Sequence, residues 1–331
     1  MVRRRMFGLL VVLSLVLAVA GVGLAASGKV MLYSSMQEDQ LLAIKKGFEA
    51  KYPDMTMEYY FAGTGRVMTK IAAEAQAGQV GADVIWVGDP ADYISFKELG
   101  ILEAYESPEA AFIDDAYKDP DGYFIGARMM NMGIAYNTLF VTPEEAPKTW
   151  FDLLDPKWND QIVMTDPGTS GTSKFWLNAI ISHPKYGLDY IEKLRANGCY
   201  MESGTTATHN QIAAGAYQVG VCLDYVTATL AEQGSPIAFI FPEDTVSIFS
   251  PIGLVKNAPN GENAKLLFDF ILSREGQEIL IAQNLISVRN DLEQPGVNVE
   301  EIAAKALSLD LEAMVKDSDE NLAAFDKLFG I

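Results

Sequence analysis

The chain has few histidines, cysteines and basic residues, and each shortage argues against a class of function. It contains 2 His and 2 Cys among 331 residues, which leaves little for a zinc site built from His and Cys ligands. Lys and Arg number 25 against 44 Asp and Glu, so the formal net charge is −19. Nucleic acid is therefore not the expected partner, because contacts to the phosphate backbone need clustered Lys and Arg.

The remaining composition is that of a globular protein. Hydrophobic residues make up 49% of the chain and aromatic residues 10%, which argues against a disordered chain. The 27 Gly and 14 Pro are ordinary numbers that exclude a collagen-like chain. A length of 331 residues allows two domains, each with its own hydrophobic core.

The first 26 residues have the pattern of an export signal. Three consecutive arginines, Arg3–Arg5, precede the uncharged apolar run Met6–Leu24, and small residues follow it. A membrane anchor is the alternative interpretation, since 19 apolar residues nearly span a bilayer. The graded order of basic, apolar and small residues favours cleavage near Ala25. We therefore predict that residues 1–25 are a signal peptide and that the mature protein is periplasmic.

The two cysteines, Cys199 and Cys222, would then lie in an oxidising compartment. We predict a disulfide between them, with two buried free thiols as the alternative. Their role is structural in either case.

Strands and helices alternate along the chain. Apolar runs such as 29–34, 55–61, 83–87 and 161–164 each precede a segment with helical spacing or a polar loop that leads into one. Further strands are expected at 133–137, 199–201, 219–225 and 247–255, and helices in the tail at 300–329. Strict alternation implies parallel strands joined by crossover helices. The sequence therefore predicts the α/β class.

Four loops that follow predicted strands contain small hydroxyl residues or glycine. They are Ser34–Ser35, Gly63–Gly65, Ser170–Ser173 and Ser203–Thr206. Ligands of open α/β sheets bind at the carboxyl ends of the strands, where helix N-termini favour anions. Each loop alone is also compatible with an ordinary helix cap. The loop formed by Ser170, Gly171, Thr172 and Ser173 has more donors than a cap requires, and we interpret it as an oxyanion cradle.

Other candidate residues lie near these loops. Arg66 and Arg128 are each compatible with a bidentate contact to an oxyanion or with a solvated position. Asp224 and Tyr225 end a strand that faces the expected cleft, where the carboxylate would bind hydroxyl or ammonium groups unless it is a structural cap. His209 opens a predicted helix after the fourth loop, where it contacts ligand or solvent.

Known enzyme motifs are not found in the sequence. Residues 168–171 read GTSG, which is not the G-x-S-x-G nucleophile elbow. The Gly63–Gly65 loop lacks the third glycine of a dinucleotide-binding fingerprint, and no P-loop motif occurs. We therefore predict no enzyme activity and no cofactor. A secreted hydrolase using Ser170 or Ser173 is a remote alternative.

Several longer segments resemble one protein family. They are YSSMQEDQLLAIKKGFEAKYP (33–53), ADVIWVGDPADYISFKELGIL (82–102), TWFDLLDPKWNDQIVMTDPGTSGTS (149–173) and AKLLFDFILSREGQEIL (264–280). They resemble the extracellular solute-binding proteins of ABC importers, in the branch of ferric-iron, 2-aminoethylphosphonate and sugar-phosphate binders. The W-x-D-L-x-x-P-K-W element at 150–158 and the G-x-E motif at 276–278 are the most specific parts of this resemblance.

This resemblance implies the two-lobe fold of type II periplasmic binding proteins. Each lobe would be a mainly parallel sheet flanked by helices, with the ligand cleft between the lobes. It implies a first lobe of residues 28–126 and 247–290, a second lobe of 130–244, and C-terminal helices at 300–331 that pack back on the lobes. The resemblance also implies a monomer, which closes on its ligand by hinge motion and delivers the ligand to a membrane permease.

The resemblance also bears on the ligand. Ferric-iron binders of this family typically have adjacent tyrosines where this chain has Asp224 and Tyr225, so Tyr225 would be the one phenolate ligand if iron is bound. The T-S-G-T-S loop resembles the phosphate-binding loop of the phosphonate and sugar-phosphate members. By this resemblance the phosphoryl oxygens are held by Ser170, Gly171, Thr172 and Ser173 with help from Ser34, Ser35 and Thr64.

The rest of the ligand would then contact His209 and Asp224. An ammonium group suits Asp224 if the ligand is an aminophosphonate, and ring hydroxyls suit it if the ligand is a sugar phosphate. We therefore expect a small phosphorylated or phosphonate ligand and no metal, with ferric iron as the alternative.

Overall fold

The structure is a computed structural model that describes residues 27–330. The predicted signal peptide lies outside the described residues. Within them, no helix is long and apolar enough to cross a membrane.

One 10-stranded sheet runs through the molecule, in the order β2-β1-β3-β10-β5-β8-β6-β7, with β4 paired to β10 and β9 to β5. The strands are β1 (Gly28–Ser34), β2 (Met55–Phe61), β3 (Val84–Trp86), β4 (Leu102–Glu103), β5 (Ile125–Asn137), β6 (Ile162–Thr165), β7 (Tyr200–Glu202), β8 (Val219–Leu223), β9 (Ile237–Ile240) and β10 (Val246–Val255). Pairing is parallel among β1, β2 and β3 and among β6, β7 and β8. It is antiparallel between β10 and β3, between β10 and β5, and between β5 and β8.

Helices surround this sheet. They are α1 (Glu38–Lys51), α2 (Thr64–Gln76), α3 (Pro90–Glu98), α4 (Gly171–Ser182), α5 (Gly187–Ala196), α6 (Thr205–Ala213), α7 (Asp224–Glu232), α8 (Gly261–Leu272), α9 (Arg274–Ile281), α10 (Val299–Lys305) and α11 (Leu311–Phe329). The predicted α/β class is confirmed.

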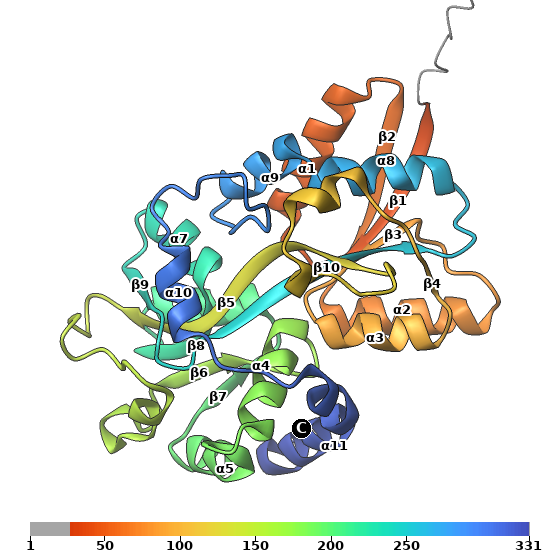
Figure 1. Ribbon diagram of the computed structural model, residues 1–331. Coiled ribbons are helices and arrows are strands. Elements are labelled where there is room, and N and C mark those ends of the chain that lie inside the picture. Colours follow the sequence, from red (N-terminus) through yellow and green to blue (C-terminus); the bar gives the residue numbers. More distant parts are fainter. Residues whose placement is uncertain (1–26, 331) are drawn as a thin grey trace, which may run out of the picture.

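The long strands β5 and β10 connect two halves of the molecule. We call β1–β3 with α1–α3, α8 and α9 the first half, and β6–β8 with α4–α7 the second half. In Figure 1, β5 and β10 run diagonally through the middle and join the first half, at the upper right, to the second half, at the lower left. The predicted lobe boundaries near residues 126–130 and 244–247 fall within β5 and at the start of β10. The exact boundaries stay a prediction.

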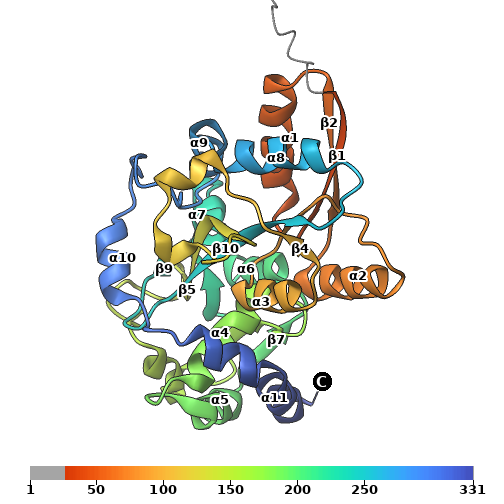
Figure 2. The ribbon, with the colours of Figure 1, turned by 45° about the vertical axis from the view of Figure 1, so that its right-hand side comes forward.

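The C-terminal helix α11 contacts α4 and α5 of the second half and α3 of the first half. It lies beside α4 and α5 in both ribbon views (Figures 1 and 2). Phe325 is fully buried, which anchors the helix on the core.

Three elements differ from the sequence-based expectation. The strand expected at 133–137 begins at Ile125, because β5 pairs with β10 over its first part and is almost entirely buried despite the polar Arg128 and Asn131. The helix expected from His209 begins at Thr205, so His209 lies in its second turn. The short strand β9, which pairs with β5, was not predicted.

The predicted disulfide is wrong, because Cys199 and Cys222 are both free and buried. Cys222 lies on β8 and packs with Ala135, Val163 and Ile212. Cys199 precedes β7 and belongs to the larger core cluster, to which Val221 also contributes. Because successive side chains of a strand point to opposite faces, Cys222 and Val221 face opposite sides of the sheet. In the sheet, β6 lies between β8, which contains Cys222, and β7, which Cys199 precedes. The two thiols are therefore separated by a strand.

The tryptophan-rich element at 150–158 forms two 3-10 turns that pack into the core. The first turn has a capping box between Thr149 and Asp152. Trp150 is fully buried, its ring meets Trp176 of α4 edge-on at 5.4 Å, and its indole N–H donates to the carbonyl of Asp244. The element thus holds the second half together and does not reach the cleft.

Candidate functional site

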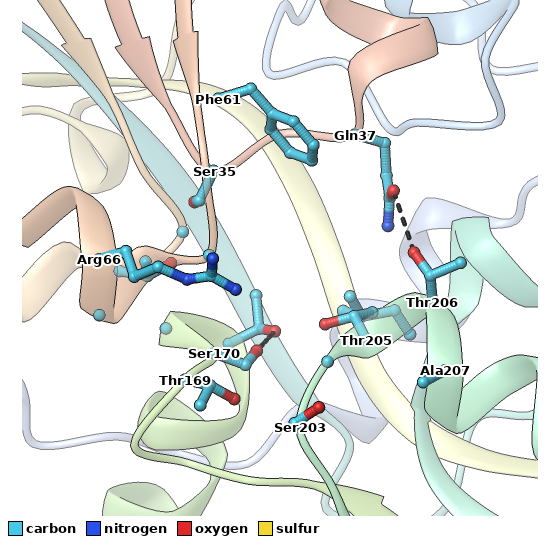
Figure 3. Close-up of a pocket in the computed structure, with 18 of the residues that line it drawn as sticks. Ser35, Gln37, Phe61, Arg66, Thr169, Ser170, Ser203, Thr205, Thr206 and Ala207 are labelled. Carbon is cyan, nitrogen blue, oxygen red and sulfur yellow. Dashed lines mark hydrogen bonds between the residues drawn. The ribbon is translucent and has the colours of Figure 1, made fainter.

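A cavity of about 580 Å³ lies between the two halves. It is lined by the β1–α1 loop, the end of β2 with the start of α2, part of β5, the β6–α4 and β7–α6 loops, and the end of β8. Figure 3 shows Ser35, Phe61 and Arg66 from the first half facing Ser170, Ser203 and Thr205 from the second. This size lies within the usual range of small-molecule sites, roughly 300–1,000 Å³.

Three helices begin at this cavity. Thr64 starts α2, Gly171 starts α4 and Thr205 starts α6, and all three residues line the space. The first N–H groups of a helix have no partner within the helix and give its N-terminus partial positive charge. Glycine precedes both α2 and α6, and a glycine has no side chain with which to cap them. The cavity therefore collects unpaired amide donors that suit an anion.

Arg128 of β5 contributes a buried positive charge to the cavity. Its side chain is 2% exposed, and its guanidinium lies over the rings of Trp86 and Tyr225 at 5.5 and 5.8 Å. Nη1 donates to Gln40 Oε1 at 3.1 Å, whereas Nε has no hydrogen-bond partner. Among residues 27–330, no carboxylate forms an ion pair with Arg128. Burial lowers the pKa of Arg128, but a guanidinium remains protonated in proteins.

Arg66 in the first turn of α2 is the second cation of the lining. It is exposed, and it follows Gly65, which lies against the Gly168 carbonyl of the β6–α4 loop. No Asp, Glu or Lys belongs to the described lining, so the cavity is locally positive in a chain whose net charge is −19.

The two halves touch at the rim of the cavity. A Cβ added at Gly65 would stand 2.5 Å from the carbonyl oxygen of Gly168, and one added at Gly171 would stand 2.9 Å from Oγ1 of Thr64. Thr206 of α6 donates a hydrogen bond of 3.3 Å to Gln37 Oε1 across the opening (Figure 3). Glycine is therefore required where backbone from the two halves meets.

Seven of the eleven predicted ligand-binding residues line the cavity. They are Ser35, Thr64, Arg66, Ser170, Gly171, Thr172 and Tyr225. The other four, Ser34, Ser173, His209 and Asp224, are buried outside the lining.

Ser34 and Ser173 act within the scaffold of the site. Ser34 donates to the carbonyl of Trp86 at 2.7 Å and accepts from the Met36 amide, which fixes the β1–α1 loop. Ser173 is 1% exposed, and its amide donates to Ser170 Oγ at the start of α4. Both hydroxyl groups therefore lie behind the cavity wall.

His209 holds α6 against β8. Its Nδ1 lies 2.7 Å from the carbonyl of Thr205, and its Nε2 accepts from the Leu223 amide at 3.0 Å. Burial lowers the pKa of His209, which favours the neutral ring. The ring thus places Thr205 and Leu223 at the cavity and does not itself line it.

Asp224 is held by β5. Its carboxylate accepts hydrogen bonds from the backbone amide and the side-chain amide of Asn131 at 3.1 and 2.6 Å, and from the Tyr225 amide at 2.8 Å. It lines a different cavity, formed by α7, β9 and the segment after α9. Burial raises the pKa of Asp224 to about 6.

Sequence reasoning missed several lining residues, among them Gln37, Phe61, Met130 and Leu223. It also left open whether Arg128 contacts the ligand or the solvent. The signal that points to Arg128 is its place within an apolar strand, because burying a charge is costly unless a partner compensates it. Gln37 and Phe61 border the first two polar loops, and nothing in their residue type distinguishes them.

The model of the family described as "Bacterial extracellular solute-binding protein" matches residues 82–316. The chain belongs to this family. Its members are solute-binding components of transport systems, so the resemblance stated from the sequence is confirmed. A relative from Salmonella typhimurium, named "Putative 2-aminoethylphosphonate-binding periplasmic protein", is 27% identical over 237 residues, which cover 69% of this chain and 67% of that one.

Two solved structures of similar fold illustrate the range of ligands. The periplasmic binding protein AfuA from Actinobacillus pleuropneumoniae, with fructose-6-phosphate bound, has a TM-score of 0.80 and 30% identity over 91% of this chain and 98% of its own. Iron-bound HitA from Pseudomonas aeruginosa also has a TM-score of 0.80, at 20% identity over 91% of this chain and 99% of its own. The latter shows the fold alone. The predicted two-lobe fold is confirmed.

Proposed function

We propose that this protein captures a small phosphorylated or phosphonate compound in the cavity between its halves and delivers it to the membrane permease of an ABC importer. The observation that carries the proposal is Arg128, a guanidinium that is 2% exposed, lines the cavity and has no carboxylate partner in the described chain. Burying an unpaired charge is costly, so an anionic ligand supplies the missing partner.

The other groups that line the cavity support a phosphoryl group in particular. The N-termini of α2 and α4 and the hydroxyls of Ser170 and Thr172 offer several donors to one anion. Phosphate binds at such termini without needing a lysine, and Arg adds bidentate hydrogen bonds. The negative net charge of the chain weakens attraction at long range only, since salt screens it within about 8–10 Å.

Ferric iron suits this cavity less well. Tyr225 is the single phenol among the described lining residues, and burial raises the pKa of its hydroxyl, which opposes a phenolate at neutral pH. A hard trivalent cation would also meet two guanidinium groups and no carboxylate among the described lining residues. A serine hydrolase is disfavoured because neither Ser170 nor His209 is free to act as nucleophile or base. The hydroxyl of Ser170 is hydrogen-bonded to the Thr172 hydroxyl and the Ser173 amide. Both ring nitrogens of His209 lie against backbone groups of Thr205 and Leu223.

The same proposal includes export by the predicted signal peptide and action in the periplasm as a monomer. It also includes hinge closure between two lobes. The first lobe consists of residues 28–126 and 247–290, and the second of residues 130–244. Contacts across the rim at Gly65 and Gly171 support a closed arrangement of the halves.

Isothermal titration of protein freed of ligand by unfolding, dialysis and refolding tests the proposal. The panel contains inorganic phosphate, phosphate monoesters, 2-aminoethylphosphonate, sulfate and ferric citrate. At least one phosphoryl compound should bind stoichiometrically without turnover. Arg128→Met should weaken its binding about 100-fold, since charged hydrogen bonds contribute about 1.5–3 kcal/mol.

Arg195→Met is a matched control. Arg195 also lies over an aromatic ring, that of Phe329 at 5.4 Å, but it is exposed and belongs to α5. Its replacement should leave the affinity unchanged. Binding of ferric iron alone, or equal affinity in Arg128→Met and the wild type, would contradict the proposal.

A further inference from the structure

The cavity is larger than a phosphoryl group needs, and its two ends differ. Figure 3 shows Arg66 on the side of Thr169 and Ser170, and Gln37, Thr206 and Phe61 on the other side. The first of these ends contains the β6–α4 loop that we assign to the phosphoryl group. The second end, which we call the Gln37 end, must receive the rest of the ligand.

The Gln37 end has neutral polar groups. Gln37 contributes an amide, and Thr205 and Thr206 contribute hydroxyls, each of which can donate and accept hydrogen bonds. Phe61 lines the cavity with a side chain that is 41% exposed, so its ring is available to a ligand. Amide and hydroxyl groups beside an aromatic face match the hydroxyls and the C–H surface of a sugar or polyol.

The described lining residues include no carboxylate that could pair with the ammonium group of a ligand. Asp224, the acid expected to pair with it, gives both oxygens to Asn131 and lines another cavity. Asp39 lies near Tyr225, but it is exposed at the start of α1 and does not belong to the described lining. An ammonium group placed in the cavity would lose its hydration without gaining an ionic partner.

We infer that the cargo is a phosphate ester of an uncharged sugar or polyol, whose hydroxyl groups bind at the Gln37 end, and not a zwitterionic aminophosphonate. This inference rests on the proposed function, because it presupposes a phosphoryl group at the other end. It assigns Gln37, Thr206 and Phe61 as residues that determine specificity.

Matched ligands test the inference on the wild-type protein. Affinities for a hexose 6-phosphate, glycerol 3-phosphate, 2-aminoethylphosphonate and ethylphosphonate are measured by isothermal titration. The tightest sugar or polyol phosphate should bind at least about tenfold more tightly than 2-aminoethylphosphonate. The ammonium group should bring no gain, so 2-aminoethylphosphonate should bind no more tightly than ethylphosphonate.

A charge introduced at the Gln37 end tests the placement. Gln37→Glu should weaken binding of the sugar or polyol phosphate about tenfold and strengthen that of 2-aminoethylphosphonate. Gln233→Glu, at the exposed end of α7, adds the same charge outside the cavity and should change neither affinity. Circular dichroism and thermal unfolding confirm that each variant is folded.

The outcomes separate the two claims. Tighter binding of 2-aminoethylphosphonate than of every sugar or polyol phosphate overturns the inference and leaves the proposed function intact. Equal ligand preference in Gln37→Glu and the wild type also overturns it. If no phosphoryl compound binds at all, the proposed function fails and the inference fails with it.

Discussion

Lys174 and Asp92 form an ion pair that joins the two halves beside the cavity. Nζ of Lys174, in the first turn of α4, lies 2.6 Å from Oδ1 of Asp92 in α3 and 3.0 Å from Oδ2 of Asp89. Both carboxyl side chains are buried. Because α3 and α4 belong to different halves, the pair contributes to the free energy of the closed arrangement.

Replacement of Lys174 should therefore weaken ligand binding without a contact to ligand. Lys174→Met leaves two buried carboxyl groups without their cation when the halves meet, and breaking a buried pair costs roughly 3–5 kcal/mol. Since the open form relieves part of this cost, we expect a loss of affinity of about 10- to 100-fold. Isothermal titration with the tightest phosphate monoester measures it.

Lys193→Met is the control for this variant, because Lys193 pairs with Asp189 on the exposed surface of α5. Small-angle scattering of the ligand-free proteins adds a second readout, in which Lys174→Met should have the larger radius of gyration. An unchanged affinity and radius would show that the pair does not favour closure.

Gly65→Ala should separate stability from binding. Gly65 is the second residue of α2, and alanine is the better helix former, so the ligand-free protein should unfold at an equal or higher temperature. Its new methyl group would stand 2.5 Å from the Gly168 carbonyl, so closure and affinity should suffer. Calorimetry and titration measure the two effects.

Gly261→Ala is the matched control, at the start of α8 with no atom within 4 Å of the added Cβ. It should leave affinity unchanged. Tight binding by Gly65→Ala would mean that the ligand-bound form does not bring the two loops together.

Asp224 should make stability depend on pH. Its pKa is raised from 3.8 to about 6 by burial, so between these values the folded protein holds a proton that the unfolded chain releases. The contribution of Asp224 to the free energy of unfolding should therefore fall as pH rises from about 4 to about 6, by up to about 3 kcal/mol, and that contribution should level off above pH 6.

Urea unfolding at several pH values measures this dependence. Asp224→Asn should remove the contribution, whereas Asp189→Asn on the exposed face of α5 should keep the wild-type slope. Parallel pH profiles for the wild type and Asp224→Asn would contradict the assignment.

The two cysteines should remain thiols in the purified protein. Burial raises the pKa of Cys199 to about 12 and raises that of Cys222 further, so both should resist alkylation in the native state at pH 8. Unfolding in denaturant without reductant should expose two reactive thiols per chain, counted by mass after iodoacetamide treatment. A count of zero would mean that a disulfide forms after all.

The polar loops at the ends of strands were predictable because their chemistry is local. Ser35, Thr64 and Ser170–Thr172 each lie after a strand, in the loop before the next helix or in the first residues of that helix, and in the structure they line the same cavity. Parallel strands place their carboxyl ends at one edge, so the proximity of loops within one half follows from the alternation itself.

Asp224, His209 and Arg128 were not predictable in the same way. Asp224 follows a strand as the loop residues do, but Asn131, 93 residues earlier in the chain, binds its carboxylate. His209 was expected to open its helix, and the four-residue earlier start of α6 turned it toward Leu223. The burial of Arg128 depends on β5 pairing with β10 on one side and β8 on the other.

The sequence by itself determined the α/β class, the family and the hydroxyl-rich and glycine-rich loops, because these depend on local periodicity and on short motifs. The tertiary structure decided which side chains reach the cavity, that the cysteines lie apart, and that the cleft residues within 27–330 include cations but no acids. These outcomes depend on strand pairing between distant segments, chiefly β5 with β8 and β10, which decides what is buried and what a buried charge can contact.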